Sequence, residues 1–129
     1  MWYIGGMAFD IAAARKHLAY RDQERAQRCR AMEAQARKDA DTIIAMLVEK
    51  YRPARIVQWG SLLRPGRFRE WSDIDIAMEG LTDPLDGLRA ADDASQLTEF
   101  PVDIVELDRI DPRHAETILQ EGLVVYEQP

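Results

Sequence analysis

The pattern of hydrophobic and polar positions divides the chain into a long helical part and a remainder of alternating strands and helices. Residues Asp10 to Tyr51 contain no glycine or proline and are rich in strong helix formers such as alanine, arginine and glutamate. Apolar residues recur in this part at helical spacing: Ile11, Leu18, Cys29, Met32, Ala36, Ile43 and Leu47. The pattern predicts one long helix, or two helices broken near residues 20–24, because Asp22 and Arg25 interrupt the apolar stripe.

A single helix over this part is longer than a small domain is wide, because some 40 residues at 1.5 Å each extend roughly 60 Å. We expect its C-terminal end to pack on the rest of the chain, through Ile43, Met46, Leu47 and Tyr51. Four upstream residues should lie too far away to reach the core: Ile11, Leu18, Cys29 and Met32. Since so thin a stripe is marginal in water, we expect it to bury against a second copy or a partner protein, which predicts a homo-oligomer formed through the N-terminal helix.

The remainder contains four short segments with the length and β-branched content of strands: residues 55–59, 73–78, 102–107 and 123–127. Two helices are predicted between them, because Asp83-Pro84 and Asp111-Pro112 each offer an aspartate cap with proline at the first helical position. The first should run to about Phe100 and the second should end at Gly122. The expected fold is a small α/β (α+β) domain over residues 52–129, with a mixed β-sheet and flanking helices, preceded by a helical extension over residues 1–51.

Composition and charge narrow the class of protein. The chain has 129 residues, of which 47% are hydrophobic, and this suits one domain with one core. Its net charge of −6 argues against a general nucleic-acid-binding face. No stretch has the roughly 20 apolar residues that a transmembrane helix requires, and the start lacks the features of a secretory signal, so we expect a cytoplasmic protein without membrane contact. The single Cys29 is expected to be a buried apolar residue.

The candidate chemistry begins with Asp73 and Asp75, which lie two residues apart in a strand-like segment. Their side chains should point to one face of the strand, while Ile74 and Ile76 point to the other. Two carboxylates about 7 Å apart repel each other unless a cation lies between them, and oxygen ligands suit Mg2+ or Mn2+. The pair indicates a metal site, although an isolated Asp-x-Asp is more often an exposed strand edge.

Gly60 and Ser61 follow directly after the first predicted strand and precede a polar stretch that contains arginines. Glycine lets the backbone approach an anion closely, and the backbone N–H groups and the serine hydroxyl are donors. A Gly-Ser pair alone is most often only a turn. The order of strand, Gly-Ser, basic connection and Ser-Asp-Ile-Asp favours an anion site beside the metal site.

A third carboxylate, Asp103, interrupts an otherwise apolar strand-like segment. Such a charge is unfavourable unless it meets solvent or a cation, so Asp103 either faces water at a strand edge or joins the metal site. Glu106 and Asp108 are weaker candidates, because Glu106 has the opposite strand parity and Asp108 lies beyond the apolar run.

These residues carry a resemblance to a known family. The segment GSLLRPGRFREWSDIDIAMEG, with VDIVEL and the ending ILQEGLVVYE, resembles the minimal nucleotidyltransferase (MNT) branch of the DNA polymerase beta nucleotidyltransferase superfamily. The nucleotide-binding residues that the resemblance implies are Gly60, Ser61 and Arg64. The catalytic and metal-binding residues that it implies are Asp73, Asp75 and Asp103. The chain departs from the family at Pro65, which makes the connection between Ser61 and Asp73 one residue longer than the common pattern.

The resemblance also implies an activity. A metal-dependent nucleotidyltransferase, with Mg2+ or Mn2+ as its cofactor, transfers a nucleoside monophosphate, here AMP from ATP, to an acceptor hydroxyl. Family members of this size resemble the antitoxin half of MNT and HEPN toxin-antitoxin pairs, which implies a HEPN-type protein partner. Two alternatives are a catalytically weak antitoxin or scaffold that acts by contact alone, and an antibiotic-type enzyme that acts on a small molecule.

For several other residues the sequence gives only weak evidence of a functional role. Arg67 and Arg69 are expected in a solvated loop, and His17 and His114 at the surface of helices. Trp59 and Trp71 flank the motif and are explained as well by packing as by contact with a base.

Overall fold

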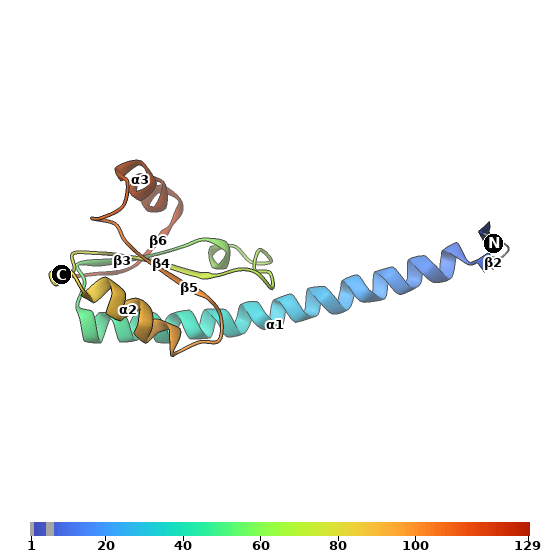
Figure 1. Ribbon diagram of the computed structural model, residues 1–129, viewed down its shortest axis with the longest axis horizontal. Coiled ribbons are helices and arrows are strands. Elements are labelled where there is room, and N and C mark those ends of the chain that lie inside the picture. Colours follow the sequence, from blue (N-terminus) through green and yellow to red (C-terminus); the bar gives the residue numbers. More distant parts are fainter. Residues whose placement is uncertain (1, 5–6) are drawn as a thin grey trace.

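The computed structural model describes residues 2–4 and 7–129, which form a four-stranded β-sheet, three α-helices and a small two-stranded sheet. The two short strands β1 (Trp2–Ile4) and β2 (Met7–Phe9) pair antiparallel at the N-terminal end. The long helix α1 (Ile11–Tyr51) follows and leads into the main sheet, beyond which it projects for much of its length (Figure 1).

Helix α1 is continuous over 41 residues, so of the two predictions for this part the single long helix is confirmed and the break near residues 20–24 is wrong. Asp10 caps its start as expected, because its side chain accepts a hydrogen bond from the Ala13 N–H at 3.2 Å. Arg52 ends the helix in the left-handed conformation, with φ of 48°, and Pro53 prevents its continuation.

The main sheet has the strand order β5-β4-β3-β6. Its strands are β3 (Arg55–Trp59), β4 (Ile74–Glu79), β5 (Val102–Glu106) and β6 (Leu123–Glu127). β3 is antiparallel to both of its neighbours, β4 and β6, whereas β4 and β5 are parallel. The expected mixed sheet is confirmed, with β4 starting and ending one residue later than predicted and β5 ending one residue earlier.

Alternate strand residues face two different cores, one on each side of the sheet. The larger core lies against α1 and α2 (Asp86–Ser95) and includes the fully buried Ile56, Ile74, Ile76 and Met78. The smaller core lies under α3 (Pro112–Glu121) and consists of Val57, Ala77, Leu107 and Ile118. The sheet is therefore covered by α1 and α2 on one side and by α3 on the other (Figure 1). Residues of opposite parity in β4, such as Asp75, face the α3 side.

The two short helices begin differently. Helix α3 follows the prediction, with Asp111 as its N-cap, Pro112 in its first turn and Gly122 at its C-terminal cap. Helix α2 begins at Asp86 and ends at Ser95, so the prediction of a helix that follows Asp83-Pro84 directly and runs to about Phe100 is wrong. The reason is local, because the Asp83 side chain accepts from the Leu85 N–H at 2.9 Å and closes a turn before the helix.

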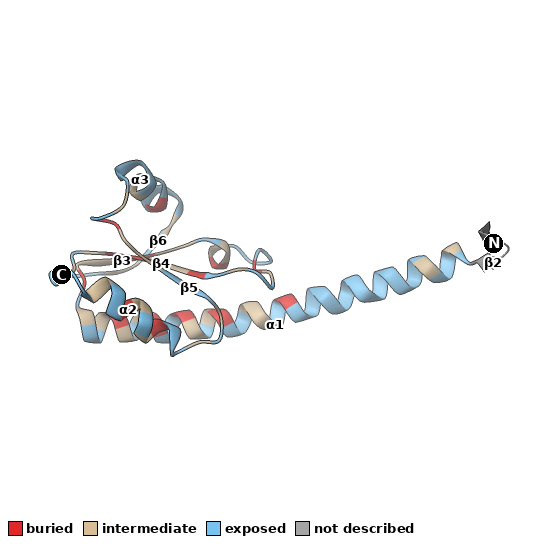
Figure 2. Cartoon of the chain, in the orientation of Figure 1, coloured by how far each residue is buried: buried red, intermediate tan, exposed pale blue. Residues whose placement is uncertain are grey.

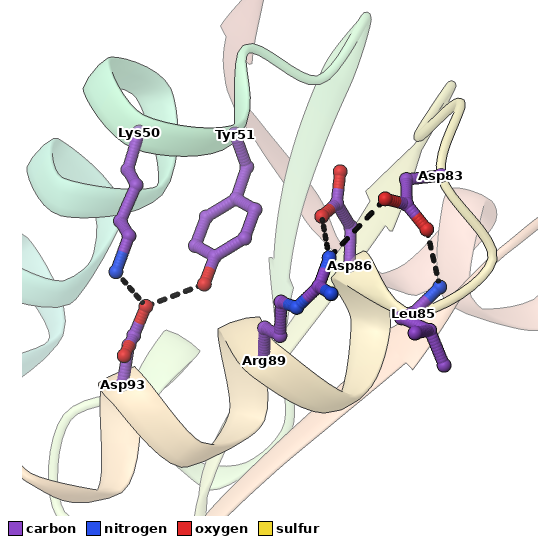
Figure 3. A network of polar contacts seen from close by, with 7 residues as sticks. All are labelled: Lys50, Tyr51, Asp83, Leu85, Asp86, Arg89 and Asp93. Carbon is purple, nitrogen blue, oxygen red and sulfur yellow. Dashed lines mark hydrogen bonds and ion pairs between the residues drawn. The ribbon is translucent and has the colours of Figure 1, made fainter.

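A polar network joins the C-terminal end of α1 to α2 (Figure 3). Lys50 and the Tyr51 hydroxyl both donate to one carboxylate oxygen of Asp93, the former at 2.5 Å. The hydrogen bond from Lys50, followed by that from Tyr51, lowers the pKa of Asp93. Burial, followed by the hydrogen bond to Asp93, raises the pKa of Tyr51 to about 12. Arg89 of α2 also pairs with Asp83 at 3.2 Å. The network fixes α2 against α1 at the end of the sheet remote from the Gly-Ser turn.

The middle of α1 reaches the core, contrary to the prediction for Cys29 and Met32. Cys29 is only 8% exposed, which confirms that it is a buried residue, and Met32 packs against the larger core. They reach it because the connection over residues 61–73 extends along the helix, where the Gly66 N–H donates to Glu33 at 3.1 Å. The division into residues 1–51 and 52–129 stays a prediction, and this packing favours an independently folding unit that begins upstream of Cys29.

The first part of α1 is exposed, as expected for residues that no other part of the chain reaches (Figure 2). Leu18 is 55% exposed and Tyr20 is 60% exposed. Among the described residues, no helix is long and apolar enough to cross a membrane.

Candidate functional site

The three aspartates predicted as catalytic lie near the N-terminal ends of two neighbouring strands, β4 and β5. Asp75 of β4 pairs in register with Asp103 of the parallel strand β5 and with Trp59 of β3. Paired residues on neighbouring strands lie about 5 Å apart and point to the same face, so the two carboxylates are neighbours on the α3 side. Asp73 is exposed and immediately precedes β4.

The electrostatics of Asp75 show that these carboxylates act on one another. Asp75 is partly buried, and its pKa is raised to about 7, first by burial and then by the charges of Asp103 and Asp73. A divalent cation relieves this repulsion, and carboxylate oxygens are the ligands that Mg2+ and Mn2+ prefer. No group of three or more His, Cys, Asp or Glu side chains in the described part of the chain forms a ready-made metal cage. Two observations therefore support a cation site: these carboxylates lie close enough to repel one another, and their oxygens are suitable ligands.

The other two acidic candidates lie outside this cluster, in agreement with the sequence argument. Glu106 pairs with Arg109 at 3.2 Å, and its side chain lies against Gly87 on the α2 side of the sheet. Asp108 accepts a hydrogen bond from the Gly80 N–H at 3.0 Å.

The Gly-Ser turn touches the carboxylate cluster directly. Gly60 follows β3 with φ of +85°, and a Cβ atom there would lie 2.1 Å from Oδ2 of Asp75. Both the backbone conformation and the contact therefore require glycine. Ser61 opens the short 3-10 helix η1 (Ser61–Leu63), and the buried Leu62 anchors this turn in the larger core. The backbone of Gly60 and the carboxylate of Asp75 are therefore held next to each other at the end of β3.

A pocket of about 500 Å3 lies between the turn and α3. Its lining residues are Trp59, Gly60, Ser61, Leu63, Arg64, Arg67, His114, Thr117, Ile118 and Glu121. The structure thus brings the predicted nucleotide-binding residues Gly60, Ser61 and Arg64 together in one pocket. Asp73, Asp75 and Asp103 do not line it, but Asp75 lies directly beside Gly60, which does.

Two residues that the sequence predicts only as surface residues, Arg67 and His114, also line this pocket. Arg67 is exposed, as expected of a loop residue, but it shares the pocket with Arg64. His114 is a surface residue, as predicted, and it also lines the pocket with its ring 5.8 Å from that of Trp59 in an edge-to-face arrangement. The Trp59 Nε1–H is buried and has no hydrogen-bond acceptor within the described residues. The helical spacing of His114, Thr117 and Glu121 was visible in the sequence, but only the fold shows that this face of α3 lies opposite the turn.

Three other residues lie away from the pocket. His17 is on the exposed part of α1, and Trp71 is 71% exposed, with the Arg25 guanidinium 5.8 Å from its ring centre. The Arg69 guanidinium donates to the Gly66 carbonyl at 2.6 Å. These three residues therefore form no part of the candidate site.

Comparison with known proteins identifies the family. The family model described as "Polymerase beta, Nucleotidyltransferase" matches residues 41–129. No curated protein sequence gives a significant match.

Several solved structures share the fold. One is a tri-AMPylated Shewanella oneidensis HEPN toxin in complex with an MNT antitoxin, with a TM-score of 0.55 at 19% identity over 72% of this chain and 73% of that one. A second is a toxin-antitoxin structure with AMP-PNP, with a TM-score of 0.56 at 22% identity over 67% and 73% of the two chains. A third is described as a candidate minimal nucleotidyltransferase, with a TM-score of 0.56 at 25% identity over 70% and 93%.

The matched residues include all four strands of the main sheet, the Gly-Ser turn and the three aspartates. The resemblance seen in the sequence and the mixed sheet seen in the structure lead to the same family. Since the family model spans well over half of the chain, this protein belongs to the polymerase beta nucleotidyltransferase family.

Proposed function

We propose that the protein transfers a nucleoside monophosphate, AMP from ATP, to an acceptor hydroxyl, with release of pyrophosphate and with Mg2+ or Mn2+ as cofactor. The observation that supports this most directly is the contact at Gly60, which joins a pocket with two arginines to a cluster of three aspartates. The triphosphate occupies the side of the turn with Ser61 and Arg64, and the reacting α-phosphate lies toward Asp75.

Each residue has a distinct role in this proposal. The backbone of Gly60 and the hydroxyl of Ser61 donate to phosphate oxygens, and Arg64 and Arg67 offset the charge of the triphosphate. Asp73, Asp75 and Asp103 would hold the divalent cations, which when bound would supply positive charge to offset the charges on the attacking and leaving oxygens. Asp103 is exposed on β5, the outermost strand of the sheet on this side, so the acceptor hydroxyl approaches from there.

The acceptor is expected on another protein. Two of the similar structures are toxin-antitoxin structures, and one of them contains an AMPylated HEPN toxin. We therefore assign the chain an antitoxin role, in which it adenylylates a HEPN-type partner in the cytoplasm.

A second candidate function is a catalytically weak antitoxin or scaffold that acts by contact alone. The exposed first half of α1 favours it, because this surface is available to a partner and remote from the aspartates. Self-association through this helix is also part of the proposal.

The test is to incubate the protein with Mg2+ and ATP labelled at the α-phosphate, with and without a HEPN protein encoded beside it. We expect label on the HEPN protein, and none when Asp75→Asn replaces the parent. A stable complex of the two proteins without label would establish the contact-only function, whereas no complex and no label would refute both candidates.

A further inference from the structure

The loop that carries the two arginines of the nucleotide pocket separates that pocket from a second one. Arg64 and Arg67 line the pocket beside the Gly-Ser turn. The residues between and after them, including Pro65 and Gly66, line a different pocket of about 490 Å3 against α1. One face of the loop therefore serves the nucleotide site, and the other face rests on the long helix.

Three hydrogen bonds define the loop at Gly66. A turn closes between the Arg67 N–H and the Arg64 carbonyl at 3.3 Å, and Gly66 has φ of +80° within it. The Gly66 N–H donates to Oε1 of Glu33 at 3.1 Å, and its carbonyl accepts from Arg69 at 2.6 Å. Both backbone polar groups of Gly66 are thus held by side chains outside the turn.

Two pairs of residues form hydrogen bonds between α1 and this loop in the described part of the chain, and the one made by Glu33 is the more restrictive. The Glu33 side chain is 14% exposed and lies 3.9 Å from Arg37 on the same helix, so its carboxylate has little freedom. Arg25 and Glu70, the second contact, pair at 3.2 Å but are 51% and 38% exposed, and such surface pairs contribute little. A carboxylate bonded to a backbone N–H in a covered position restrains the loop more strongly.

We propose that Glu33 is a positioning residue, which holds the turn so that Arg64 and Arg67 remain directed at the triphosphate. The inference rests on the proposed function and adds a site contribution from α1. Without this contact, two like charges three residues apart repel each other, and a loop lengthened by Pro65 has more conformations to lose on binding. The long helix is on this account part of the nucleotide site.

The experiment compares Glu33→Ala, Glu33→Gln and a control, Glu24→Ala, by calorimetric titration with ATP in the presence of Mg2+. Glu24 lies on the same helix, is exposed, and makes no hydrogen bond or ion pair within the described part of the chain. We expect Glu33→Ala to weaken ATP binding roughly 3- to 10-fold. Glu33→Gln retains an acceptor for the Gly66 N–H and should lie close to the parent, as should the control.

Two further measurements separate positioning from general stability. Binding of Mn2+ alone should be unchanged in Glu33→Ala, because none of the three aspartates lines the pocket that Arg64 and Arg67 share. Amide hydrogen exchange without nucleotide should become faster at Gly66 and Arg67 and stay unchanged in the strands. If Glu33→Ala fails to fold, Glu33→Asp, which keeps the charge but shortens the reach, should show the same selective loss.

The possible results are distinct. If the parent binds ATP and Glu33→Ala binds it equally well, or loses Mn2+ and ATP binding to the same extent, the positioning role is wrong and the proposed function stands. If the parent itself binds no ATP with Mg2+, the proposed function is wrong and this inference falls with it.

Discussion

At the scale of single residues, Asp75 is the group on which the site depends, because it is partly buried beside two other carboxylates. Its pKa of about 7 in the folded protein exceeds its ordinary value of 3.8, so the folded state binds the proton more tightly than the unfolded state. The stability that this proton contributes is full below about pH 4 and is lost as pH rises to about 7. In the absence of metal the ionised carboxylate therefore destabilises the fold at neutral pH.

The substitution Asp75→Asn removes the ionised carboxylate that destabilises the metal-free protein at neutral pH. In EDTA the variant should be more stable than the parent at pH 8, by about 1 to 2 kcal/mol once the partial exposure of the group is taken into account, and the difference should vanish near pH 4. Urea unfolding at both pH values measures it, with the exposed Asp41→Asn as a control for loss of a charge. A variant that is less stable than the parent at pH 8 would contradict the crowding of these carboxylates.

Gly60 and Gly66 provide a matched pair of substitutions at positive φ. A Cβ atom at Gly60 would meet Asp75, whereas a Cβ atom at Gly66 would have nothing within 4 Å. Both alanine variants lose about 1 kcal/mol to backbone strain, and Gly60→Ala must in addition displace the carboxylate. We expect Gly60→Ala to abolish the rise in melting temperature produced by Mn2+, and Gly66→Ala to retain it. An equal response of both variants would show that Gly60 and Asp75 do not share a site.

At the scale of elements, the sequence predicted the parts of the fold that depend on local patterns. Alternation of apolar and acidic residues placed Asp73 and Asp75 opposite Ile74 and Ile76, and the register of β4 with β5 then brought Asp103 beside Asp75. The prediction of a break in the helix near residues 20–24 is wrong, because an exposed helix made of strong helix formers does not need a continuous apolar stripe.

The rest of the site depends on contacts between residues that are distant in sequence. The bond between Glu33 and Gly66 joins positions 33 residues apart, and nothing in the local pattern of α1 marks it. In the same way, nothing in the sequence of α3 marks His114 as a neighbour of Trp59, and the two rings meet only because the fold packs α3 on that side of the sheet. Local periodicity thus identified the strands that carry the aspartates, but not the residues of α1 and α3 that pack around the site.

Truncation of α1 tests where the packed part of this helix begins. Deleting residues 1–21 removes exposed helix and leaves Asp22 as a new cap, so the loss of unfolding free energy should stay below about 1 kcal/mol. Deleting residues 1–35 also removes Cys29, Met32 and Glu33, and should cost about 2 to 4 kcal/mol and weaken ATP binding. Urea unfolding and calorimetry measure both effects, and equal stabilities of the two truncations would restore the boundary at residue 51.

At the scale of the whole molecule, charge is separated along the long axis. Residues 10–30 carry six lysines or arginines against three acidic residues, a net charge of +3. The whole chain has a net charge of −6, so the remainder carries −9. Apart from the buried Cys29, most of the basic segment is exposed, and it extends past the core on the side of the loop between η1 and β4 (Figure 1).

This separation predicts self-association in which the basic segment of one copy lies against the acidic core of another. Two basic segments repel each other, so segment-to-core contact is favoured over a pairing of the two helices. Ile11, Ala14 and Leu18 share one helical face and supply the apolar part of the contact, with Leu18 55% exposed in the single chain. Light scattering should give a dimer at 50 mM NaCl that dissociates toward monomer at 500 mM, because salt screens the attraction. Leu18→Gln should weaken the dimer, whereas His17→Gln, one position away and off the apolar face, should not. A chain that is monomeric at every salt concentration would leave the exposed segment to the partner protein instead.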